Sequence, residues 1–75
     1  MKITIISALN HLLLRYSWSK QMEIRIHDIL AATRSSGEQG YQERMMYHRS
    51  VPSPSVRHTM ELIHAFVESH REEVA

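Results

Sequence analysis

The chain has 75 residues, of which 43% are hydrophobic, and a formal net charge of +1, so it can form one small domain, residues 1–75, around a single core. It has no cysteine, which excludes disulfides and thiolate metal ligands and fits a reducing compartment such as the cytoplasm. Residues 44–60 carry three arginines and no acidic residue. This local excess of positive charge is typical of a surface that meets an anionic partner.

The first segment predicts a helix over residues 5–16, because its apolar residues recur on one helical face, with Leu14 outside that face. The residues of the face are Ile5, Ile6, Leu9, Leu12, Leu13 and Tyr16. A short strand over Lys2–Ile6 is the alternative, since β-branched residues alternate there. Asn10 and His11 interrupt the apolar run, which is also too short to span a membrane, so we interpret it as core rather than as a targeting segment.

A second helix is predicted over residues 19–35, with Ser19 as a capping residue and Gly37 as the stop. Its apolar stripe consists of Met22, Ile26, Ile29, Leu30 and Thr33. The two glycines of the chain predict a turn over residues 36–40. A short third helix over residues 41–49 then carries a weak stripe of Tyr41, Met45 and His48.

The last helix is predicted over residues 54–73, because Ser53 is a good N-cap and Pro54 suits the first helical position. The sequence therefore predicts an all-α fold, a bundle of three to four helices. An α+β fold remains the alternative if the N-terminal segment forms a strand.

The apolar residues of the last helix follow a spacing of three and four, as in a heptad seam. Such a small chain, without disulfide or metal, gains stability if it buries this seam against a second copy. We therefore expect a homodimer, and the alternative is that the seam packs inside one monomer. The expected interface residues are Val56, Met60, Ile63, Phe66, Val67 and His70.

Three histidines, His58, His64 and His70, follow one another at intervals of six residues on this helix. Six residues correspond to about 240° of helical rotation, so the three side chains point in different directions and share no metal site. The pair Glu61 and His64 has a spacing found in carboxylate-bridged metal sites, but we expect it to face water. His70 lies on the apolar seam, where protonation would weaken a dimer at mildly acid pH.

Enzyme chemistry has little support, because the chain has no cysteine nucleophile, no glycine-rich phosphate loop and no paired carboxylates on an apolar helical face. No cofactor is expected. Tyrosine, methionine and arginine, which are enriched in protein interfaces, are concentrated in the third helix. The expected contact residues are Tyr41, Arg44, Met45, Tyr47 and Arg49.

The sequence thus favours a small non-enzymatic module that covers a surface of another protein. An inhibitor or regulator of the kind that phages and other mobile elements often encode would fit this description. The alternative is a dimeric helix-turn-helix-like DNA-binding regulator that uses residues 28–49, where two helices flank a glycine-containing turn.

Overall fold

The computed structural model describes residues 2–71, and these form an all-α bundle. Helix α1 spans Ile5–Arg15, α2 spans Lys20–His48 and α3 spans Pro54–His70. The predicted all-α fold is confirmed. Within the described residues, β-type pairing is confined to one isolated bridge between Ile3 and Arg71, so the N-terminal strand does not form.

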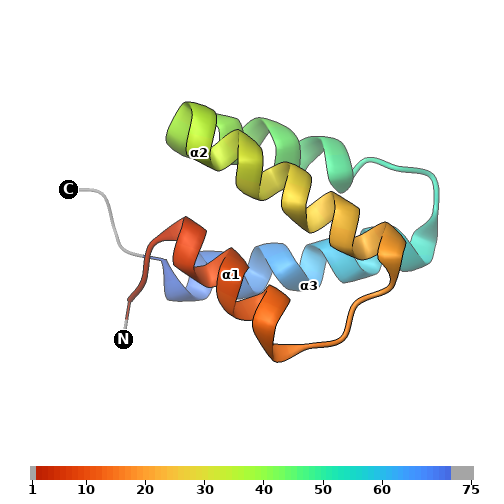
Figure 1. Cartoon of the computed structure of the whole chain (residues 1–75). Coiled ribbons are helices and arrows are strands. Elements are labelled where there is room, and N and C mark those ends of the chain that lie inside the picture. The colour runs from red at the N-terminus through yellow and green to blue at the C-terminus, as the bar shows by residue number, and fades with distance from the viewer. Residues whose placement is uncertain (1, 72–75) are drawn as a thin grey trace.

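Helix α2 is a hairpin of two arms, because its backbone leaves the helical region at Ser36 and Gly37. Gly37 has a φ of 60°, a left-handed conformation that favours glycine. The arms, residues 20–35 and 38–48, lie side by side and run in opposite directions (Figure 1). The predicted turn over residues 36–40 is therefore too long, since the helix resumes directly after the glycine.

Gly40 sets the close approach of the two arms. A Cβ atom at this position would lie 2.9 Å from the carbonyl carbon of Ala32 and nearer still to its oxygen. Only a residue without a side chain lets the second arm pack this closely against the first. The hairpin is thus fixed by two glycines with different roles, one in the turn and one in the contact.

Each helix begins at a capping side chain. Thr4, Ser19 and Ser53 accept hydrogen bonds from backbone N–H groups in the first turns of α1, α2 and α3 respectively. Pro54 is the first residue of α3, as predicted. The helix ends at His70, and the remainder of the predicted range, residues 72–73, lies outside the described residues.

The core lies where α1, the α2 hairpin and α3 meet. All five residues of the stripe predicted for residues 19–35 are buried, whereas Leu14 of α1 is 88% exposed, in agreement with its predicted place outside the apolar face. The buried apolar side chains are Ala8, Leu9, Leu12, Met22, Ile26, Ile29, Leu30, Tyr41, Met45, Val56, Met60, Ile63 and Val67.

We predict that Gly40→Ala destabilises the protein by about 1–3 kcal/mol, because the added methyl group forces the two arms of α2 apart. Urea unfolding followed by circular dichroism measures the change. Arg34→Ala is the matched control, since Arg34 is exposed on the same helix and its replacement changes the free energy of unfolding by less than about 0.5 kcal/mol. Equal stability of Gly40→Ala and the wild type would contradict the close contact.

Candidate functional site

The structure separates the five residues expected to contact a partner into two groups. Tyr41 and Met45 are fully buried, because the second arm of α2 turns their stripe toward the core. Their assignment to a contact surface is therefore wrong. Tyr47 is 62% exposed and the side chain of Arg44 is 52% exposed, while Arg49 is partly buried beside Glu61 at 3.1 Å.

The residues expected at a dimer interface also divide. Four of them lie in the core of the single chain, because α1 and α2 cover the inner side of α3. These four are Val56, Met60, Ile63 and Val67. Their assignment to an interface between copies is corrected accordingly, and the alternative, a seam that packs inside one monomer, describes them. Phe66 and His70 are only half-buried and remain at the surface.

The buried Tyr41 joins the second arm of α2 to α3. Its hydroxyl lies 3.2 Å from Nδ1 of His64. Burial raises the pKa of Tyr41 above its ordinary value of 10.0, and Glu68 acts in the same direction, so the hydroxyl keeps its proton. His64, expected in solvent with Glu61, is instead half-buried and held by this bond.

A polar cluster holds the open end of the hairpin. His48, with a side chain only 7% exposed, lies between Asp28 at 2.7 Å from Nε2 and Arg25 at 3.0 Å from Nδ1. Because a guanidinium can only donate, Nδ1 accepts and Nε2 carries the proton toward Asp28. Arg44 lies 3.6 Å from the same carboxylate. Each arm contributes two residues to the cluster, which therefore ties the two arms together.

The histidines of α3 lie in different environments, as the sequence predicted. His64 bonds to Tyr41, His70 stacks on Phe66 with ring centroids 4.2 Å apart, and His58 is exposed. Within residues 2–71, no group of three His, Asp or Glu side chains is arranged so that it could hold a metal ion.

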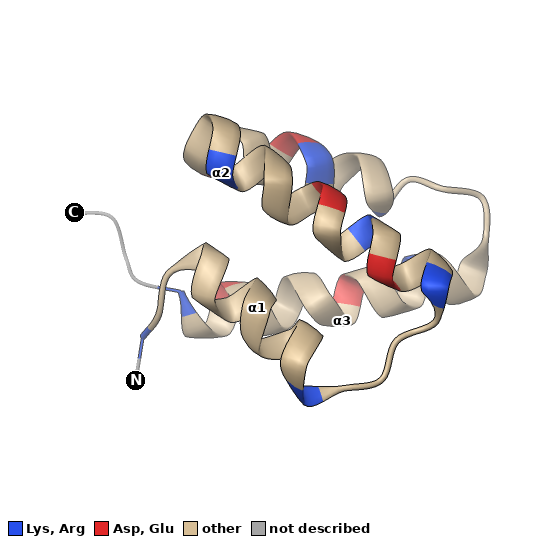
Figure 2. Cartoon of the chain, viewed as in Figure 1, with Lys and Arg blue, Asp and Glu red and all other residues tan. Residues whose placement is uncertain are grey.

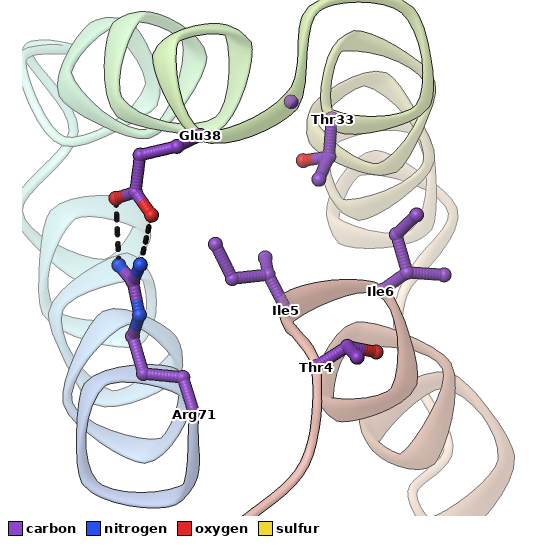
Figure 3. Close-up of a pocket in the computed structure, with 7 residues that line it drawn as sticks. Thr4, Ile5, Ile6, Thr33, Glu38 and Arg71 are labelled. Atoms are coloured by element: carbon purple, nitrogen blue, oxygen red, sulfur yellow. Dashed lines mark hydrogen bonds and ion pairs between the residues drawn. The ribbon is translucent and has the colours of Figure 1, made fainter. Parts of the chain in front are cut away.

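A notch of about 280 Å³ lies where residues 4–6 and Arg71 meet the α2 corner (Figure 3). On one side of the notch, Arg71 pairs with Glu38 through both terminal nitrogens of its guanidinium group. Ile5 projects into the notch between this ion pair and Thr33 (Figure 3). Thr33 donates its hydroxyl proton to the backbone of Ile29, and Thr4 caps α1. The polar side chains of the notch are thus engaged in holding the fold.

A second apolar depression is a groove of about 310 Å³ between α1, the 16–19 linker and α3. We call it the aromatic groove, and its lining residues are Leu12, Tyr16, Trp18, Thr59, Leu62, Ile63 and Phe66. None of them is charged, although 23% of the chain is. Tyr16 and Leu62 are 56% and 58% exposed, so large apolar side chains face the solvent here.

Both walls of the aromatic groove are fixed by contacts within the chain. Trp18 donates from Nε1 to the carbonyl of Leu12 at 2.9 Å, which also accepts the backbone N–H of Tyr16 at the end of α1. Tyr16 meets the Trp18 ring edge-on, with centroids 6.0 Å apart. On the opposite wall, Phe66 stacks on His11 of α1 with centroids 5.6 Å apart. The groove is therefore preformed.

Sequence reasoning missed most of this groove. Tyr16 was assigned to the apolar face of the first helix, but that helix ends at Arg15 and Tyr16 has extended backbone. Leu62 lies outside the core stripe of α3, and this is the signal that could have marked it as a surface residue. No sequence pattern predicts that Trp18 lines the groove, because its contact with Leu12 depends on the path of the linker.

Comparison with known protein families, with characterised proteins and with solved structures gives no match to this chain. Over residues 2–71, the helices are too short or too polar to cross a membrane. The function must therefore be argued from the surface of the chain itself.

We predict that Tyr41→Phe lowers the free energy of unfolding by about 0.5–1.5 kcal/mol at neutral pH, because one hydrogen bond is lost while water reaches the half-buried His64. Above pH 10 the difference shrinks. Tyr41 has a pKa above 10.0 when folded and an ordinary one when unfolded, so its stabilisation is complete below pH 10 and is lost as the pH rises further.

Chemical denaturation at pH 7, 10 and 11 measures this difference. Tyr47→Phe is the control, since that side chain is exposed, and it leaves both the stability and its pH dependence near those of the wild type. If Tyr41→Phe and the wild type lose stability in parallel above pH 10, the proposed burial of the hydroxyl is wrong.

Proposed function

We propose that this protein is a non-enzymatic interaction module that binds an apolar segment of another protein in the aromatic groove. The observation that best supports this proposal is a preformed groove with no charged lining residue. Its large apolar side chains include Tyr16, Trp18, Leu62 and Phe66. Aromatic side chains dominate the energetics of protein interfaces, and a preformed site avoids the entropic cost of ordering its walls. We place its action in the cytoplasm, since the chain has no cysteine.

The size of the groove favours side chains of a protein over a free small molecule. At about 310 Å³ it matches only the smallest ligand pockets, and it is open to solvent. Its polar atoms are few, because Trp18 already uses its N–H toward Leu12. A site of this kind selects by shape and apolar area. One or two large aliphatic or aromatic side chains, carried on a partner's surface, satisfy it.

DNA binding through residues 28–49 is less well supported by the geometry. The helices of a helix-turn-helix cross at a steep angle, whereas the arms of α2 run antiparallel and make contacts between Arg25 and His48 at their far ends. Arg44 and Arg49 lie beside Asp28 and Glu61, which reduces their availability for phosphates. Basic and acidic residues are interspersed along α2 (Figure 2), in the order Lys20, Glu23, Arg25, Asp28, Arg34, Glu38, Glu43 and Arg44.

Affinity capture from the native host with matched variants tests the proposal. We predict that Leu62→Arg abolishes retention of the partner protein, because a guanidinium placed at the groove cannot be buried without a large desolvation cost. Leu14→Arg is the control, since Leu14 is 88% exposed, does not line the groove and undergoes the same chemical change. It retains the partner fully.

Two outcomes would contradict the proposal. One is a captured protein whose retention is equal in both variants. The other is retention of duplex DNA with an affinity that falls steeply between about 50 and 200 mM salt, the behaviour of a phosphate-binding surface. Circular dichroism of both variants verifies that each retains the helical fold.

A further inference from the structure

The segment that contains the linker side of the aromatic groove carries basic residues without acidic ones. Leu12, Tyr16 and Trp18 form one wall of the groove, and residues 2–22 around them contain Lys2, Arg15 and Lys20 and no acidic residue. Arg15 and Lys20 bracket the 16–19 linker, and both are exposed. The first carboxylate in the chain is that of Glu23, in the first turn of α2. Arg15 and Lys20 therefore place positive charge at the two ends of the linker, and we call this pair the basic rim.

The α3 wall adds no compensating negative charge on the groove side. The helix presents Thr59, Leu62 and Phe66 to the groove. Its nearest carboxylate in sequence, Glu61, is a neighbour of Leu62 but lies about 100° away around the helix and pairs with Arg49. The rings of His11 and His70 both stack on Phe66.

We infer that the occupant of the aromatic groove is an acidic amphipathic helix, with apolar side chains in the groove and carboxylates opposite Arg15 and Lys20. This inference rests on the proposed function and names the partner's chemistry. An amphipathic helix presents apolar residues at intervals of three and four on one face and charged residues on its flanks. Such a ligand matches both the uncharged lining and the basic rim of this surface.

The contacts that hold Trp18 in place favour a rigid ligand such as a helix. Its indole is held by Leu12 and edge-packed by Tyr16, so the wall does not need to reorder when a ligand docks. The groove is bounded by a helix on the α3 side and by the end of α1 on the other. A third helix laid between them would cover Leu62 and Tyr16, the large apolar side chains that the chain leaves exposed here.

Trp18 is the single tryptophan of the chain, and it reports directly on the groove. The test titrates the full chain with synthetic peptides of about 15 residues, roughly four helical turns. The first peptide has leucines at helical spacing with flanking glutamates. The second replaces the glutamates by lysines, and the third replaces the leucines by alanines. Tryptophan emission is recorded for each peptide.

We expect the acidic leucine peptide to shift the Trp18 emission with saturation. The lysine peptide should bind at least about tenfold more weakly, and the alanine peptide should give no saturable shift. Leu62→Arg should abolish binding of the acidic peptide, and Leu14→Arg should preserve it. The double variant Arg15→Gln, Lys20→Gln should bind several-fold more weakly and lose most of the salt dependence seen between about 50 and 300 mM.

Each other result overturns the inference. Equal binding of the acidic and lysine peptides removes the role of charge, and stronger binding of the lysine peptide reverses it. If neither leucine peptide binds, while capture from the host still depends on Leu62, the occupant is wrong but the proposed function stands. Sedimentation that shows a dimer abolished by Leu62→Arg identifies a second copy as the occupant instead.

Discussion

The close packing of the two arms of α2 is the constraint on which the rest of the structure depends. It needs a glycine at Gly37 to reverse the chain and a glycine at Gly40 to let the backbone of Ala32 approach. Once the second arm lies on the first, its stripe of Tyr41, Met45 and His48 faces inward. Tyr41 then reaches His64, and the hairpin presents a surface on which α3 packs.

The elements of this fold could be predicted from the sequence because the signals for them are local. Apolar residues at helical spacing, the Ser53–Pro54 cap and the glycines of the turn each act within a few residues. Those predictions agree with the structure to within a few residues at each helix end. The same spacing could not say which other element each stripe would meet, because that depends on contacts between distant segments.

The prediction was wrong for two of the five contact residues, Tyr41 and Met45, for this reason. Tyr41 and Met45 are of residue types enriched in interfaces, and the same types fill a core equally well. The apolar seam of α3 could likewise pack against a second copy of the chain or against the chain's own helices. In a chain of this size the most apolar helical faces are needed to form the core. The surface available to a partner therefore consists of apolar residues outside those faces, such as Leu62 and Tyr16.

The aromatic groove follows from the way α1 ends. Tyr16 takes extended backbone as the C-cap, so the chain leaves the helix before it can cover the outer side of α3. Trp18 turns back to bond the carbonyl of Leu12, and this contact fixes the linker at the edge of the depression. The carbonyl of Leu12 also accepts the backbone N–H of Tyr16, the C-cap of α1. One carbonyl therefore joins the end of α1 to the linker wall of the groove, so a change in the linker that displaces Trp18 would alter the groove and remove one of the two hydrogen bonds to this carbonyl.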